Sequence, residues 1–280
     1  MNCAQFCPVG KLEKLLVATD RSQFSDGAIR EGINFAKKCS SRLYIVSVLE
    51  TNPEYETIGS NVFEKEKEEL MAHLDSVKAM TAKEGLGCET IFHETADPSQ
   101  TIIDEADKKN VDMIIIGRRG RTGLMKVLMG SVAARVIAHA PCKVLVVPRA
   151  ARIEYRNILV ATDGSVHAAA AVTEAISIAK RCGSNLIALS AMRDQSEREE
   201  AARYANEAVE LARKEEVSAE AVTPTGRSFD VIVETAGGRA VDLIVMGTYG
   251  KAGIKKLLMG SSTEKVIGNA GCAVLVVKAT

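Results

Sequence analysis

Short apolar runs alternate with longer amphipathic stretches along the chain, a pattern that predicts strands alternating with helices. The apolar runs, such as LLVA and MIIIG, are rich in Val, Ile and Leu, which is typical of strands buried on both faces of a parallel sheet. In the first half we expect strands at 14–19, 43–49, 89–93, 113–116 and 143–147, and helices at 25–39, 63–84, 98–110 and 131–138. The second half repeats the alternation. Both halves are therefore predicted to form an α/β doubly wound fold, with helices on both faces of a five-stranded parallel sheet.

The chain contains an internal repeat. Residues 16–20 read LVATD and so do residues 159–163, at an offset of 143. Towards the end of each half, Gly117 is matched by Gly247 at an offset of 130, so the second copy lacks 13 residues. We expect most of this loss to fall after the second strand. The repeat predicts two tandem domains, residues 1–150 and 151–280.

The charge balance limits the classes of partner. The chain of 280 residues carries 36 basic and 36 acidic side chains, and this neutrality argues against a general nucleic-acid-binding protein. No apolar run approaches the roughly 20 residues that span a bilayer. Residues 1–11 lack the basic start and apolar stretch of a signal peptide. We therefore expect a cytoplasmic protein that binds neither nucleic acid nor membrane.

The seven cysteines are scattered through a long chain, so we expect no disulfide framework. Cys3 and Cys7 form a C-x3-C pair, for which a metal or redox site is the alternative interpretation; companion ligands at suitable spacing are missing. Cys142 and Cys272 precede apolar strands and are predicted to be small packing residues. The histidines form no pair at ligand spacing, and no metal site is predicted.

A glycine-rich segment follows the fourth strand of each half. The first reads Gly117-x2-Gly120-x9-Gly130-Ser131, and the second repeats it with Gly247, Gly250, Gly260 and Ser261. Glycines let backbone N–H groups approach a phosphate, and the N-terminus of the following helix adds its dipole. We expect each serine to cap its helix and contact a phosphate oxygen. The alternative is that the glycines serve only tight turns and close packing.

Together these motifs resemble the universal stress protein family. Each half opens with V-x-[TV]-D-x-S, and the glycine segment follows late in the same half. The resemblance covers nearly the whole chain and implies strand order 3-2-1-4-5 in each half. In the branch of the family that keeps the glycine motif, it also implies binding of ATP or AMP, with Mg accompanying ATP.

The resemblance transfers a set of nucleotide contacts to each half. They comprise the end of strand one, the end of strand two, the last residue of strand four, and the glycine motif with the residues after it. In the first half these are Thr19, Asp20, Val48, Ile116, Gly117, Gly120, Gly130, Ser131 and Val132. In the second half they are Thr162, Asp163, Ala191, Met246, Gly247, Gly250, Gly260, Ser261 and Ser262. Basic loop residues are candidates for phosphate neutralisation, or else are simply solvated: Arg118, Arg119, Arg121, Lys126, Lys251, Lys255 and Lys256.

The predicted function is that of an adenine-nucleotide-binding regulator of the stress response, with no catalytic residue assigned. The sequence has no G-x4-G-K-[ST] loop, G-x-S-x-G elbow or H-E-x-x-H pair. Weak ATP hydrolysis stays open. An enzyme acting at an α-phosphate would normally show an S-G-G-x-D-S loop, which ATDRS and ATDGS do not match.

A nucleotide-independent scaffold is the other alternative. The terminal strands 143–147 and 273–277 are short and apolar, and in the family such strands pair antiparallel between domains. We therefore expect the two halves to pair through them, and two chains to form a homo-dimer. Because the second half is shorter after its second strand, we also expect weaker or more exposed nucleotide binding there.

Overall fold

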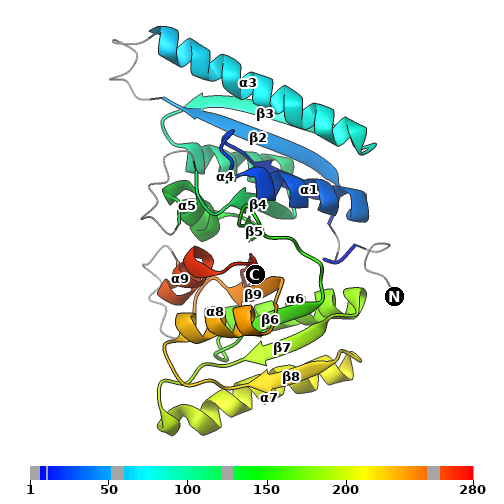
Figure 1. The fold of residues 1–280 in the computed structure, drawn as a ribbon, viewed down its shortest axis with the longest axis vertical. Helices are drawn as coiled ribbons and strands as arrows, with labels where there is room; N and C mark the ends of the chain where they lie inside the picture. The colour runs from blue at the N-terminus through cyan, green and yellow to red at the C-terminus, as the bar shows by residue number, and fades with distance from the viewer. Residues whose placement is uncertain (1–6, 11, 52–59, 121–128, 251–258, 280) are drawn as a thin grey trace.

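The chain folds into two α/β halves with the same succession of elements (Figure 1). The computed structural model describes residues 7–10, 12–51, 60–120, 129–250 and 259–279. The first half contains β1 (Lys14–Ala18), α1 (Asp26–Cys39), β2 (Arg42–Glu50), α3 (Ser60–Lys83), β3 (Cys88–Thr95), α4 (Pro98–Lys109), β4 (Met113–Gly117), α5 (Ser131–His139) and β5 (Lys143–Val147). The second half contains β6 (Asn157–Ala161), α6 (Val166–Cys182), β7 (Asn185–Leu189), the short 3-10 helix η2 (Gln195–Glu197), α7 (Arg198–Lys214), β8 (Ala219–Val222), α8 (Ser228–Gly238), β9 (Leu243–Gly247), α9 (Ser261–Asn269) and β10 (Ala273–Val277).

Each half has the strand order that the resemblance implies. The first five strands lie in the order β3-β2-β1-β4-β5, and the other half runs β8-β7-β6-β9-β10. All pairings within a half are parallel; Val17 of β1, for example, lies between Ile45 of β2 and Ile115 of β4. The predicted doubly wound fold is confirmed, and β1 and β4 are neighbours at the point where the strand order reverses.

The two sheets join into one sheet of ten strands. β10 pairs antiparallel with β5, and Leu275 faces Leu145 in that register. Figure 1 shows the first half, blue to green, above the second half, green to red, with this seam between them. The expected pairing of the terminal strands is therefore present within the chain. This pairing occupies the β5 and β10 edges of the two sheets, which a single separate domain would expose to a partner.

Two hydrophobic layers hold the halves together, one on each face of the sheet. Side chains of a strand alternate between faces, so Leu15 and Val17 belong to one layer while Leu16 and Ala18 belong to the other. The first layer includes Phe35 of α1 together with residues of α6. Both layers continue across the seam between β5 and β10, so the strand ends that carry the glycine motifs are fixed relative to one another.

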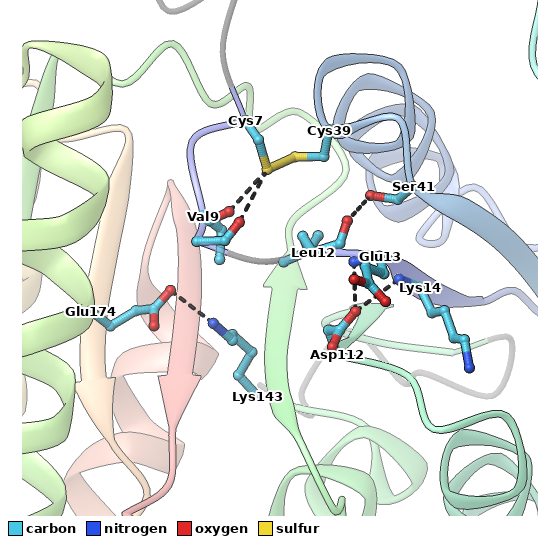
Figure 2. The surroundings of a disulfide bond; sticks show 11 residues. Cys7, Val9, Leu12, Glu13, Lys14, Cys39, Ser41, Asp112, Lys143 and Glu174 are labelled. Atoms are coloured by element: carbon cyan, nitrogen blue, oxygen red, sulfur yellow. Dashed lines mark hydrogen bonds and ion pairs between the residues drawn. A yellow bond between two sulfur atoms is a disulfide. The ribbon is translucent and has the colours of Figure 1, made fainter.

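Disulfide bonds correct the expectation that the scattered cysteines form no disulfide framework. Cys7 is bonded to Cys39 at the end of α1, and Cys182, at the equivalent end of α6, is disulfide-bonded too. Figure 2 shows the segment after Cys7 lying against the first half, where Ser41 Oγ donates to the carbonyl of Leu12 at 2.5 Å. Cys7 therefore does not form a local C-x3-C site, and Cys3 lies outside the described residues. The two bonded positions are 32 residues apart, a proximity that spacing along the sequence does not reveal.

The described residues show neither a metal-binding cluster nor a membrane-spanning helix. Within these ranges, no three His, Cys, Asp or Glu side chains gather in a way that could hold a metal ion. Among the same residues, every helix is either too short or too polar to span a lipid bilayer.

Candidate functional site

A cavity lies at the carboxyl end of the sheet in each half. The first cavity has a volume of about 170 Å³ and the second about 890 Å³. Every residue that the sequence assigned to the first site lines the first cavity: Thr19, Asp20, Val48, Ile116, Gly117, Gly120, Gly130, Ser131 and Val132. Every residue assigned to the second site lines the second: Thr162, Asp163, Ala191, Met246, Gly247, Gly250, Gly260, Ser261 and Ser262. The structure brings each set together, and its role in nucleotide binding stays a prediction.

The turn after the first strand and the glycine segment approach each other closely in each half, which explains why the second position of each motif is a glycine. A Cβ atom on Gly120 would lie 3.0 Å from Oδ2 of Asp20, and one on Gly250 would collide with Oδ2 of Asp163. Any side chain at these positions would push the glycine loop away from the end of the first strand. The glycines thus let the carboxylate of strand one and the backbone of the loop share one cavity wall.

The third glycine begins the helix after the loop. α5 and α9 have Gly130 and Gly260 as their N-cap residues, without a side-chain cap in either case. Ser131 and Ser261 are instead the first helical residues, so the predicted capping role of the serines is wrong. The N-cap glycine N–H donates to the residue after the strand in both halves, at 3.0 Å. This bond turns the helix N-terminus and its dipole towards the cavity.

Helix α3 forms one wall of the first cavity. Leu70 and Glu66 of this helix line the cavity, and Leu70 is only 2% exposed. His73 Nε2 lies 2.8 Å from the hydroxyl of Thr19, which is 5% exposed. Desolvation lowers the pKa of His73. Sequence reasoning missed these α3 residues, because nothing in a helical pattern shows which face meets a distant strand end.

Helix α7 covers the second cavity more loosely. Its cavity-lining residues are Glu200, Ala201 and Tyr204. The Tyr204 ring lies against Gly164, which has φ of +74°, so a Cβ on Gly164 would collide with the ring. The Tyr204 hydroxyl donates to Glu200 at 2.5 Å. An aromatic ring therefore forms one wall of the second cavity and leaves its interior open.

Basic and hydroxyl groups gather at the α8 and α9 side of the second cavity. The side chains of Arg227 and Lys265 lie 5.0 and 4.7 Å from the ring centroid of Phe229, and all three line the cavity. The hydroxyls of Ser228 and Ser262 are 2.8 Å apart and connect the first turns of the two helices. Two helix N-termini and two cations therefore face the same region, an arrangement suited to an anion. Of these residues the sequence pointed only to Ser262.

The basic residues of the first loop have different roles. Arg118 Nη1 donates to the carbonyl of Ala270 at 2.9 Å, so this guanidinium caps α9 of the other half instead of neutralising a phosphate. Arg119 lines the first cavity, and its Nε is buried with no hydrogen-bond partner within the part of the chain that the structure describes. The other basic candidates lie outside the described residues: Arg121, Lys126, Lys251, Lys255 and Lys256.

These observations define a tandem doubly wound protein with a cavity at each switch point. The sequence profile of the universal stress protein family matches residues 11–148 and again 154–278. The chain therefore belongs to this family, with two such domains in tandem.

Individual relatives agree with this assignment. A universal stress protein of Methanocaldococcus jannaschii is 36% identical over 141 residues, which are 49% of this chain and 82% of that protein. A universal stress protein of Bacillus subtilis is 30% identical over 147 residues, covering 48% of this chain and 97% of that protein. The crystal structure of a universal stress protein from Archaeoglobus fulgidus superposes with a TM-score of 0.79 at 22% identity, over 99% of this chain and 98% of the other. That last likeness shows a shared fold along the whole chain.

The two cavities differ in size, and the shorter second half has the larger one. β2 and α3 have 9 and 24 residues, whereas β7 and α7 have 5 and 17, so the second half is shorter in its second strand and in the helix that follows. We expected nucleotide binding in the shorter half to be weaker or more exposed. The larger volume of its cavity does not test the affinity, which stays a prediction.

Proposed function

We propose that this protein is an adenine-nucleotide-binding regulator of the stress response. The observation that carries the proposal is the second cavity, whose volume of about 890 Å³ lies within the roughly 300–1,000 Å³ of small-molecule sites. One wall of the cavity is a glycine loop and the N-terminus of α9, and another carries the carboxylate of Asp163. Helix N-termini of this kind suit phosphate groups.

Each wall of the second cavity has a role in this proposal. The phosphates would lie on the backbone N–H groups that begin α9, with Lys265 and Arg227 supplying positive charge. Asp163 would face the ribose hydroxyls. The apolar residues Ala191 and Met246 would lie beside the adenine. ATP, accompanied by Mg, and AMP are both candidate ligands, since both carry the same adenosine and α-phosphate.

We assign binding and not catalysis to these residues. Among the described residues, the pair near a cavity that is most like a nucleophile with its base is Thr19, which lines the first cavity, and His73 behind it, with 2.8 Å between Oγ1 and Nε2. Thr19 is 5% exposed and belongs to the smaller cavity, so a substrate has little access to its hydroxyl. Weak ATP hydrolysis remains the second candidate activity, and its assay is phosphate release by the purified protein.

The homo-dimer and the cytoplasmic location stay predictions. β5 and β10 already pair within the chain, so two chains would need another surface to associate. Disulfides are rare in the cytosol of mesophiles and common in intracellular proteins of hyperthermophiles. The Cys7–Cys39 bond is therefore compatible with a cytoplasmic location if the protein comes from a hyperthermophile. Sedimentation with and without ATP distinguishes a nucleotide-driven assembly from a constitutive scaffold.

The test of the proposed function is direct. Purified protein is denatured and any released nucleotide is identified by mass spectrometry, and ATP and AMP are titrated into the nucleotide-free protein by calorimetry. We expect binding that weakens at least tenfold in Gly260→Val, because a Cβ there already lies 3.1 Å from the carbonyl of Thr248. Gly271→Val is the matched control, since a Cβ at Gly271 meets nothing within 4 Å. No released nucleotide together with no heat from either ligand would overturn the proposal.

A further inference from the structure

The helices that cover the two cavities, α3 and α7, can be aligned residue by residue. At the end of α3, the N–H of Leu86 donates to the carbonyl of Thr81 at 3.0 Å. At the end of α7, the N–H of Val217 donates to the carbonyl of Ala212 at 2.9 Å. The same hydrogen bond therefore closes both helices, at positions that differ by 131. The parallel registers of β2 with β3 and of β7 with β8 give the same offset for the strands that follow.

This alignment identifies one position at which the helices over the two cavities carry different side chains; we call the part of each cavity that this helix lines its roof. Leu70 of α3 corresponds to Ala201 of α7, and both line their cavities. Both are also buried, at 2% and 4% exposure, so neither side chain can turn away into solvent. The first cavity is thus filled by an isobutyl group where the second has only a methyl group.

The neighbouring contacts hold the first roof in place. His73, one turn after Leu70, is bound to Thr19 at the end of β1. Arg21, in the turn after β1, forms an ion pair with Glu69 of α3. In the second half the equivalents of His73 and Arg21 are Tyr204 and Gly164, which meet by ring-to-backbone packing. Two polar contacts from α3 therefore fasten it over the first cavity.

The first turns of the last two helices of each half, which we call the floor of the cavity, also differ between the halves. The hydrogen-bonded hydroxyls of Ser228 and Ser262 lie at the floor of the second cavity. Pro98 and Val132 occupy the equivalent positions in the first, where neither side chain can hydrogen-bond. The first cavity is consequently both smaller and less polar where phosphates would lie, although Arg119, whose Nε is buried, brings one positive charge to it.

We propose that only the second half of this chain binds an adenine nucleotide, and that α3 closes the homologous site of the first half. The inference rests on the proposed function and adds which site is used. A volume of about 170 Å³ falls below the roughly 300 Å³ of the smallest small-molecule sites, whereas the second cavity lies near the upper end of that range. The chain therefore pairs one open nucleotide site with one closed site that helps hold the fold together.

The first measurement is the stoichiometry and location of binding in the wild-type protein. Calorimetric titration with Mg-ATP and with AMP is expected to give one site per chain. Photolabelling with 8-azido-ATP, followed by peptide mapping, is expected to modify peptides of the second half alone. Absence of binding would overturn the proposed function, whereas two sites, or a label in the first half, would overturn this inference and leave the function intact.

The second experiment fills the cavity of the second half by a substitution in α7 and measures the affinity for Mg-ATP. Ala201→Leu reproduces the first roof in the second half and is expected to weaken Mg-ATP binding at least tenfold. Ala202→Leu is the matched control, because its neighbouring position on α7 does not line the cavity. Thermal unfolding of both variants checks that they are folded. Unchanged affinity in a folded Ala201→Leu protein would contradict the inference, and the labelling result decides the matter if that variant does not fold.

Discussion

Single residues at equivalent positions show where the two halves share a structural role and where they differ. Asp112 accepts hydrogen bonds from the N–H groups of Glu13 and Lys14 at 2.7 and 2.8 Å (Figure 2). Asp242 does the same for the residues that lead into β6. These aspartates anchor the start of the first strand in each half. Leu70 and Ala201, by contrast, lie at one equivalent position and give the two cavities different volumes.

At the residue scale, we predict that Cys142 and Cys272 are unreactive thiols. Burial raises the pKa of each thiol to about 12. At pH 7.5 fewer than about one in ten thousand of these groups is a thiolate, compared with about a tenth of ordinary cysteines. Alkylation by iodoacetamide should therefore be very slow and should accelerate as the pH rises towards 12.

The measurement is mass spectrometry of peptides after timed labelling of the folded protein. Protein unfolded in urea is the control, in which both cysteines should react at the ordinary rate. Rapid labelling of either residue in the folded protein at pH 7.5 would show that the thiol is less buried than the structure indicates.

At the element scale, the helices over the two cavities differ in length and in how they are attached. α3 has 24 residues and α7 has 17. α3 is fastened to the end of β1 by the His73–Thr19 hydrogen bond, whereas α7 packs through Tyr204. A histidine thus helps to attach α3 to its site.

This attachment predicts a pH dependence of stability. Burial lowers the pKa of His73 in the folded chain, while the unfolded chain keeps the ordinary value of 6.5. Below pH 6.5 the unfolded state binds a proton that the folded state does not, so stability is complete above pH 6.5 and is lost as the pH falls towards the lowered value. Asp20 and Asp26 oppose this shift, and Arg21 adds to it.

The experiment compares the free energy of unfolding in urea at pH 7.5, 6.5 and 5.5. Wild-type protein should lose more stability over this range than His73→Gln, which cannot be protonated there. Parallel declines in the two proteins would show that His73 does not carry the effect. The control variant is His139→Gln at the end of α5, which should follow the wild type.

At the scale of the whole molecule, the ten-stranded sheet and its two hydrophobic layers make the halves one body. Leu145 and Leu275 face each other across the seam and are each 1% exposed. Contacts from side chain to backbone cross the same boundary in both directions. Arg118 binds Ala270, and Lys278 Nζ donates to the carbonyl of Ala140 at 2.7 Å. The cation of each half thus meets the end of the last helix of the other.

The Cys7–Cys39 bond should stabilise this body from its N-terminal end. It closes a loop over 32 positions of sequence, and disulfides of ordinary loop length contribute about 2–4 kcal/mol to stability. We predict that the double variant Cys7→Ser/Cys39→Ser has a free energy of unfolding lower by about this amount in urea under oxidising conditions. With dithiothreitol present, the difference from wild type should disappear. Equal stability under oxidising conditions would contradict the prediction.

The sequence alone determined the elements, the repeat and those cavity residues that belong to the strand ends and the glycine motifs. The strand predicted at 14–19 is observed at Lys14–Ala18, and the helix predicted at 63–84 is observed at Ser60–Lys83. Such agreement is possible because buried parallel strands are continuous apolar runs and surface helices are periodic, both of which are local patterns. The glycine motifs located the cavities because parallel strand ends meet at the switch point.

Only the tertiary structure decided which cavity is open, which cysteines are bonded and what Arg118 contacts. Each of these depends on the approach of residues far apart in the sequence: α3 over the end of β1, Cys7 against α1, and one half against the other. The shorter second half predicted weaker or more exposed nucleotide binding, and its affinity stays a prediction. Cavity volume depends on how side chains from distant elements pack, and at one equivalent buried position Leu70 occupies more of the first cavity than Ala201 does of the second.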